Sequence, residues 1–179
     1  MLKRNDTVLL VIDVQGNLAH LMDNRKDLFE NLQKIIKGTQ IFGIPSLWIE
    51  QNPQGLGATI TEIAEILSDS PKIEKLSFSC LKTPAFETAL KQTGRRQVLV
   101  SGIEAHICVY QTSLDLIEAG YEVYVVSDAV SSRKRENKTL ALENLRAAGA
   151  KISSVEMALF EMLQKAEGKL FKKLVALLR

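Results

Sequence analysis

The sequence predicts an α/β fold with three layers, in which helices cover both faces of a mostly parallel six-stranded sheet. Apolar runs of strand length alternate along the chain with segments of helical periodicity, which is the pattern of repeated strand–helix units. The chain has 179 residues, of which 46% are hydrophobic. That is enough for one domain with a sizeable core, and we expect a single domain over residues 1–179.

Six strands and the helices between them follow from this pattern. We expect strands at residues 7–13, 45–51, 72–75, 97–102, 121–129 and 151–157. We expect helices at residues 28–43, 59–67, 83–94, 107–120 and 136–149, and a helical tail at about 157–179 that breaks near Gly168. Thr83 has the position of an N-cap, and Pro84 that of the first helical residue.

Composition and charge exclude several classes of function. A net charge of +2 gives no electrostatic footprint for nucleic acid. The apolar stretch near the N-terminus is interrupted by Asp13, and it is too short for a signal peptide or a membrane span. Two cysteines make no disulfide framework, which suits a reducing, cytoplasmic location. The two isolated histidines, His20 and His106, predict no metal centre.

The strand order brings two reactive side chains together. Ligands of open α/β sheets bind at the carboxyl ends of the strands, where the strand order reverses. If the first and fourth strands are neighbours, Asp13 and Cys108 meet there. Cys108 opens a helix, and the N–H groups of a helix N-terminus lower the pKa of a thiol. The alternatives are a buried, inert cysteine and an aspartate that caps a helix or a solvated strand end.

A carboxylate beside a thiolate needs a cation, because like charges disfavour each other. Lys75 lies at the end of the third strand and could supply that charge, although spacing alone does not select it over Lys72. A solvated surface lysine is the alternative reading.

Three segments together resemble the isochorismatase-like cysteine hydrolases, the superfamily that includes the nicotinamidases. They are LLVIDVQ (9–15), KLSFSCL (75–81) and SGIEAHICVYQTSLDLIEAGYEVYVVSDAVSS (101–132), and the likeness extends from about residue 6 to about residue 160. The segments EQNPQGLG (50–57) and GIEA (102–105) are most similar to the branch called isochorismatase domain-containing proteins.

The resemblance implies the strand order 3-2-1-4-5-6 and a catalytic triad of Asp13, Lys75 and Cys108. It selects Lys75 over Lys72 by its spacing to the aromatic Phe78 and the serine after it. It also implies a cis peptide between Ile103 and Glu104. That peptide would aim the Glu104 N–H, together with the Cys108 N–H, at a developing oxyanion.

The sequence departs from the family at the metal site of the nicotinamidases. The Asp and two His that follow the second strand in those enzymes are absent here, so we expect no metal and no cofactor. The Glu104 side chain either points into the pocket or caps the helix. Cys80 is expected to be a small buried filler. Four further residues could either line the pocket or belong to the core: Gln15, Trp48, Gln51 and Phe78.

The sequence therefore predicts a cysteine-dependent hydrolase that cleaves a C–N amide bond of a small molecule through a thioester. One alternative is an isochorismatase-type hydrolase of vinyl ethers. The other is a non-catalytic oligomeric protein of this fold that binds ligands or carries a redox thiol. We expect a homo-oligomer with no nucleic-acid or membrane partner. The apolar face of the tail is needed for docking on the body or on another subunit.

Overall fold

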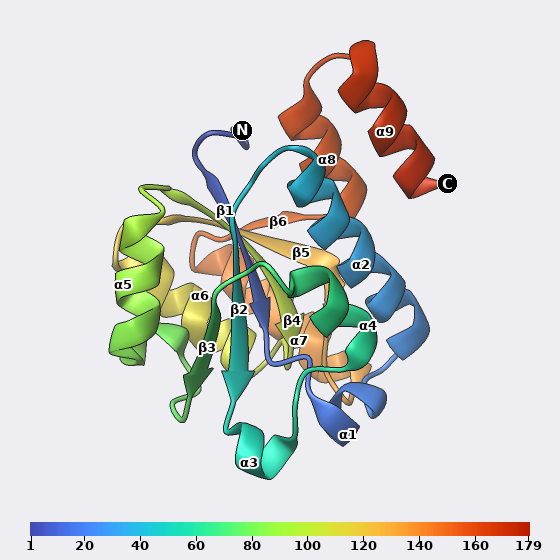
Figure 1. Cartoon of the computed structure of the whole chain (residues 1–179). Helices are drawn as coiled ribbons and strands as arrows, with labels where there is room; N and C mark the ends of the chain where they lie inside the picture. The colour runs from blue at the N-terminus through green and yellow to red at the C-terminus, as the bar shows by residue number, and fades with distance from the viewer.

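The computed structural model describes residues 1–179. Its six strands form one sheet with the order β3-β2-β1-β4-β5-β6, and all five strand pairings are parallel (Figure 1). The predicted fold class and strand order are confirmed. The strands are β1 (Thr7–Ile12), β2 (Ser46–Gln51), β3 (Lys72–Lys75), β4 (Gln97–Ile103), β5 (Glu122–Ser131) and β6 (Lys151–Ser153).

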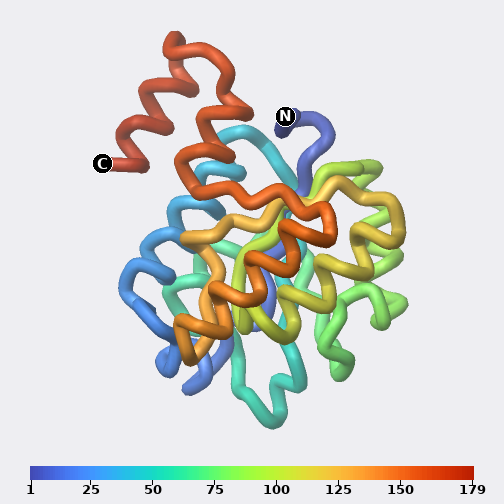
Figure 2. The backbone as a smooth tube through the Cα atoms, turned by 180° about the vertical axis from the view of Figure 1, so that it is seen from behind, coloured from blue at the N-terminus to red at the C-terminus, as the bar shows by residue number.

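Helices cover both faces of the sheet, and each face has its own core. The α-helices are α1 (Gly16–His20), α2 (Arg25–Ile41), α3 (Pro53–Leu56), α4 (Thr61–Ala64), α5 (Pro84–Gln92), α6 (Cys108–Glu118), α7 (Arg135–Ala147), α8 (Val155–Leu163) and α9 (Gly168–Leu178). Two short 3-10 helices are η1 (Glu65–Leu67) and η2 (Cys80–Lys82). Side chains of α2, α4, α8 and α9 pack into one apolar cluster, and those of α5, α6 and α7 into the other. Figure 2 shows the second face, which α6 and α7 cross.

Several elements differ from the sequence-based prediction. The last strand is shorter than expected, because the Ser154 hydroxyl accepts a hydrogen bond from the Met157 N–H (3.2 Å) and starts α8 at Val155. Two short helices, α1 and α3, were not expected. Thr83 precedes α5 as predicted, but its hydroxyl lies 3.2 Å from the Ser77 hydroxyl and does not cap the helix.

The C-terminal tail docks on the body of the same chain. It breaks into α8 and α9 near Gly168, which has a positive φ of 83°. Leu174 of α9 is fully buried in the apolar cluster that includes α2. Helix α9 lies beside α2, at the end of the molecule opposite the carboxyl ends of the strands (Figure 1). No helix combines the length and the apolar character that crossing a membrane requires.

Gly102 lets the two central strands approach each other closely just before the candidate site. It pairs with Ile12 across the β1–β4 register, and its φ is +109°. A Cβ atom at this position would lie 2.1 Å from the Ile12 carbonyl oxygen. Only glycine tolerates both the backbone angle and the contact. Asp13 and the turn that leads to Cys108 therefore begin from adjoining points of the sheet.

Candidate active site

Asp13 and Lys75 form a buried ion pair at the carboxyl edge of the sheet. Asp13 follows β1, with 2% of its surface exposed and a φ of +54°, which an aspartate adopts at some cost. Its N–H donates to the Ile49 carbonyl (3.1 Å), which ties this backbone to β2. The Lys75 Nζ, at the end of β3, donates to Asp13 Oδ2 at 2.8 Å. The fold thus brings together charges that lie 62 residues apart in the sequence.

Cys108 is the first residue of α6, and 7% of its surface is exposed. Its Sγ lies 3.9 Å from Gln51 Oε1, and the thiol and the Asp13 carboxyl influence each other's ionisation. Asp13 Oδ1 has no hydrogen-bond partner, whereas Oδ2 is bound by Lys75. One carboxylate oxygen is therefore available to receive a proton.

The expectation that the helix N-terminus lowers the thiol pKa was wrong for the assembled site. Burial raises the pKa of Cys108, and the nearby Asp13 carboxylate raises it further, while Lys75 opposes both. Desolvation and like charge disfavour the thiolate more than the helix dipole favours it. The resting Cys108 is a protonated thiol at neutral pH.

The two neighbouring titratable groups are affected by the same environment. Burial raises the pKa of Asp13 above the usual range of a carboxyl, and the Lys75 ammonium opposes this increase. Cys80 is fully buried in the same apolar cluster as Cys108. Burial raises its pKa to about 12, and none of its surface is exposed to a substrate.

The backbone before Cys108 offers two N–H groups. The peptide between Ile103 and Glu104 is cis. Glu104 lies outside the helices and strands, and its N–H donates to no backbone carbonyl. Cys108 is the first residue of α6, so its N–H has no partner within the helix. The Glu104 side chain instead pairs with Arg133, accepting from its backbone N–H (3.0 Å) and its Nε (3.2 Å). Sequence reasoning missed this pairing.

Gln15, which is buried, and Gln51, which is half-buried, both belong to the hydrogen-bond network around Lys75. Gln51 Oε1 accepts from Lys75 Nζ at 2.6 Å, and Gln51 Nε2 donates to the Leu76 carbonyl at 2.7 Å. Gln15 is fully buried and bonds to both the N–H and the carbonyl of Gln51. Gln51 ends β2 and pairs with Lys75 in the β2–β3 register, a pairing that the sequence alone does not specify.

Trp48 and Phe78 lie apart from this cluster. The Trp48 indole packs against the apolar cluster on the α2 face, while Cys108 belongs to the cluster on the other face. Its Nε1 donates to the Thr59 hydroxyl at 2.7 Å, and the Lys72 ammonium lies 5.4 Å from its ring. Phe78 is 54% exposed and lines a cavity of about 210 Å³ between the segment after β3 and α6.

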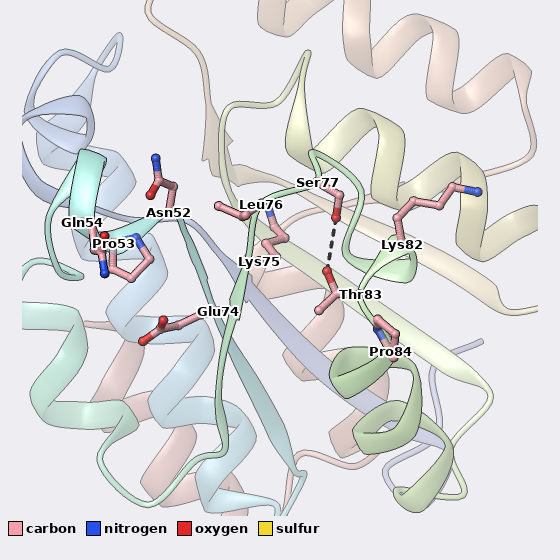
Figure 3. Close-up of a pocket in the computed structure, with 10 residues that line it drawn as sticks. All are labelled: Asn52, Pro53, Gln54, Glu74, Lys75, Leu76, Ser77, Lys82, Thr83 and Pro84. Carbon is pink, nitrogen blue, oxygen red and sulfur yellow. Dashed lines mark hydrogen bonds between the residues drawn. The ribbon is translucent and has the colours of Figure 1, made fainter.

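A larger cavity of about 510 Å³ adjoins Lys75 at the open edge of β3 (Figure 3). Residues 52–54 form one wall and residues 82–84 the other, with Lys75 and Leu76 between them (Figure 3). The lining is mostly polar and consists of Asn52, Pro53, Gln54, Glu74, Lys75, Leu76, Ser77, Lys82, Thr83 and Pro84. Cys108 is not part of this lining, so the cavity meets the buried cluster through Lys75.

The histidines are engaged elsewhere. His106 contacts the Ser132 hydroxyl through Nδ1 (2.9 Å) and the Asn137 amide through Nε2 (3.3 Å). His20 stacks edge-on against Phe29. No group of three or more His, Cys, Asp or Glu side chains is arranged to hold a metal ion.

Solved structures define the class of this fold. The MAR1 ribonuclease of Caenorhabditis elegans superposes with a TM-score of 0.92 at 32% identity, over 98% of this chain and 91% of its own. The YcaC gene product of Escherichia coli, described as an octameric hydrolase of unknown specificity, superposes with a TM-score of 0.93 at 22% identity, over 98% and 89%. The molecule is thus an α/β protein with the isochorismatase-like hydrolase fold.

Sequence comparison identifies the family. The Isochorismatase domain matches residues 7–157. The secreted isochorismatase effector Isc1 of Phytophthora sojae is 37% identical over 180 residues, covering 98% of this chain and 85% of the effector. The chain belongs to the isochorismatase family, as the three sequence segments predicted.

Proposed function

We propose that the protein is a cysteine hydrolase that cleaves a C–N amide bond of a small molecule, with Asp13, Lys75 and Cys108 as its catalytic triad. The observation that carries the proposal is the buried Asp13–Lys75 ion pair, which lies near the Cys108 thiol at the start of α6. Burying two charges and an aspartate of positive φ is costly, and such features concentrate at functional sites.

In this mechanism Asp13 Oδ1 takes the Cys108 proton as Sγ attacks the substrate carbonyl carbon. The Glu104 and Cys108 N–H groups stabilise the oxyanion. The C–N bond then breaks, and Asp13 returns the proton to the leaving nitrogen, which leaves a thioester. Asp13 next removes a proton from water, whose oxygen attacks the thioester. The acid is released, and the sulfur recovers its proton.

Lys75 has two roles in this scheme. Its ammonium neutralises Asp13 in the resting site, and it offsets the thiolate charge when the proton has moved. Lys75 also lines the 510 Å³ cavity, and we propose that the rest of the substrate binds in this cavity. Seven of the ten residues that line that cavity are polar or charged, which suits a small polar molecule rather than a large apolar one. Of the four residues considered for substrate binding, Phe78 lines the separate 210 Å³ cavity beside α6, and its contact with substrate is part of the proposal.

The assembly and location are further parts of the proposal. We propose a cytoplasmic homo-oligomer, in which Leu76 (80% exposed) and Phe78 supply apolar contact surface near the site. The octameric YcaC relative supports this assembly. We also propose that residues 1–179 form a single domain.

A binding or redox-thiol role fits the site less well. Redox-sensing cysteines have a low pKa and are solvent-accessible. Cys108 is buried, and its pKa is raised.

A substrate panel tests the proposal. It contains small primary and secondary amides, isochorismate as a vinyl ether, and RNA, because the C. elegans relative is called a ribonuclease. We expect turnover of an amide, and a thioester on Cys108 detected by intact-mass spectrometry after rapid quenching. Amide turnover that survives in both Cys108→Ala and Cys108→Ser would contradict the mechanism. Turnover confined to isochorismate would favour the vinyl-ether reaction, and RNA cleavage alone would replace the small-molecule proposal.

A further inference from the structure

The Gln51 amide lies between Lys75 and Cys108, and its neighbours fix its orientation. The lysine ammonium can only donate a hydrogen bond, so the amide atom 2.6 Å from it is the oxygen. The Leu76 carbonyl can only accept, so the atom 2.7 Å from it is the nitrogen. The negative end of the amide dipole therefore points into the site.

The same oxygen serves the thiol. Gln51 Oε1 lies 3.9 Å from Cys108 Sγ, within the range of a hydrogen bond that sulfur donates. An acceptor at this place favours the S–H form over the thiolate. Lys75 directs hydrogen bonds to Asp13 and to Gln51, and the structure contains none from Lys75 to the sulfur. Gln51 thus competes with the sulfur for the lysine.

The position of Gln51 is itself held by a buried residue. Gln15, with no exposed surface, accepts from the Gln51 N–H at 2.6 Å and donates to the Gln51 carbonyl at 3.0 Å. Gln15 Nε2 also donates to the Gly57 carbonyl at 2.7 Å, which ties the segment after β2 to Gln15. These bonds fix the backbone of Gln51, and the contacts with Lys75 and Leu76 fix its side-chain amide.

We propose that Gln51 is a positioning residue, whose amide oxygen holds the Lys75 ammonium against Asp13 and keeps the Cys108 proton on sulfur until Asp13 takes it. The inference rests on the proposed hydrolase and adds to its triad a fourth group that orients the other side chains and transfers no proton itself. Other ionisable groups also act on this site. Cys80 lies near the sulfur and Glu50 near Asp13, but neither bonds to the Gln51 amide.

The test measures the thiol itself and needs no substrate. The rate of iodoacetamide alkylation of Cys108 is followed against pH in a Cys80→Ala background. Gln51→Met keeps the side-chain length and removes the amide. We expect a lower thiol pKa and about fivefold faster alkylation at pH 7, the factor that the loss of one hydrogen bond carries. Gln51→Glu brings a negative charge to the sulfur, so it should shift the thiol pKa upward and slow alkylation.

Gln111→Met is the matched control, because Gln111 is exposed on α6 one turn after Cys108. It should alkylate at the parent rate. Unchanged or slower alkylation of Gln51→Met would overturn the inference, as would parental behaviour of Gln51→Glu. Thermal melting of each variant establishes that the protein measured is folded.

Two further variants separate this inference from the proposed function. Asp13→Asn should lower the thiol pKa, and Lys75→Met should raise it, because these charges act on the sulfur in those directions. If both respond and the Gln51 variants do not, the Gln51 role fails while the electrostatics of the site stand. If the Gln51 variants respond but no amide is hydrolysed, the hydrolase proposal fails while the positioning of the thiol stands.

Discussion

The middle of the sheet and its carboxyl edge differ in the kind of side chain that they bury. In the middle, Leu10 of β1 and Val100 of β4 are register partners, are fully buried and belong to the apolar cluster on the α6 face. At the edge, three residues further along β1, Asp13 is equally buried but charged, has a positive φ and leaves one oxygen unpaired. The first arrangement stabilises the fold, whereas the second costs stability and supplies chemistry. Substitutions in the two regions should therefore affect different measurements.

The largest effect is expected at Cys108. Cys108→Ala removes the proposed nucleophile, and turnover should fall by about 10⁴-fold or more. The melting temperature should change little, because alanine replaces a small side chain at the rim of the core. Initial rates and thermal melts of the same preparation measure both quantities. A variant that lost stability but kept turnover would place Cys108 with the middle of the sheet.

Asp13 should show the next largest effect and a change in pH dependence. Asp13→Asn removes the proposed general base, and turnover should fall by about 10²–10⁴-fold. Only the carboxylate accepts a proton, so wild-type turnover should fall as the pH falls through the pKa of Asp13. Burial raises that pKa, so this acid limb lies at a higher pH than for an ordinary carboxyl near ~3.9.

The asparagine variant provides the control for this assignment. Its residual activity should lack the acid limb, because no group at position 13 then titrates. A limb at the same pH in both proteins would assign it to another residue. The profile of kcat/KM, rather than of kcat, is the relevant one, since it reports the free enzyme.

Leu10 should show the reverse behaviour. Leu10→Ala leaves a cavity under α6, and the free energy of unfolding should fall by about 2–5 kcal/mol. Turnover per folded molecule should stay within about twofold, since the carboxyl edge is untouched. Leu140→Ala, on an exposed leucine of α7, is the matched control and should change stability by less than about 0.5 kcal/mol. Denaturant unfolding measured alongside initial rates would reveal any coupling between the two regions.

The difference between the apolar middle of the sheet and its polar edge also explains which features the sequence could predict. Apolar runs such as residues 7–12 alternate with helical segments, so the layered sheet could be predicted from the pattern, whereas its strand order was implied by the family resemblance. The residues Asp13, Lys75 and Cys108 could be singled out because each lies at or after the end of a predicted strand and matches a family segment. Their grouping within one buried cluster depends on the β1–β4 and β2–β3 registers, which no local pattern specifies.

Other features depend on contacts that local reasoning does not contain. The thiol pKa was expected to fall because the helix N-terminus is visible in the sequence, whereas the degree of burial and the Asp13 contact are not. Gln51 was one of four polar or aromatic candidates, and only the tertiary structure separates it from Trp48. The two side chains come from one strand, three residues apart, and lie in different environments.

That pair leads to the smallest expected effect. Trp48→Phe removes the indole hydrogen bond to Thr59, and the free energy of unfolding should fall by about 1 kcal/mol with turnover unchanged. Phe78→Ala should do the opposite, with unchanged unfolding because the ring is half exposed, and with a KM raised about three- to tenfold if the ring contacts substrate. Each variant is thus the control for the other. A rise in KM for Trp48→Phe would mean that the α2 face communicates with the site, since the ring packs against the opposite core. Residues on both faces of the sheet, and not only those at its carboxyl edge, would then influence the reaction.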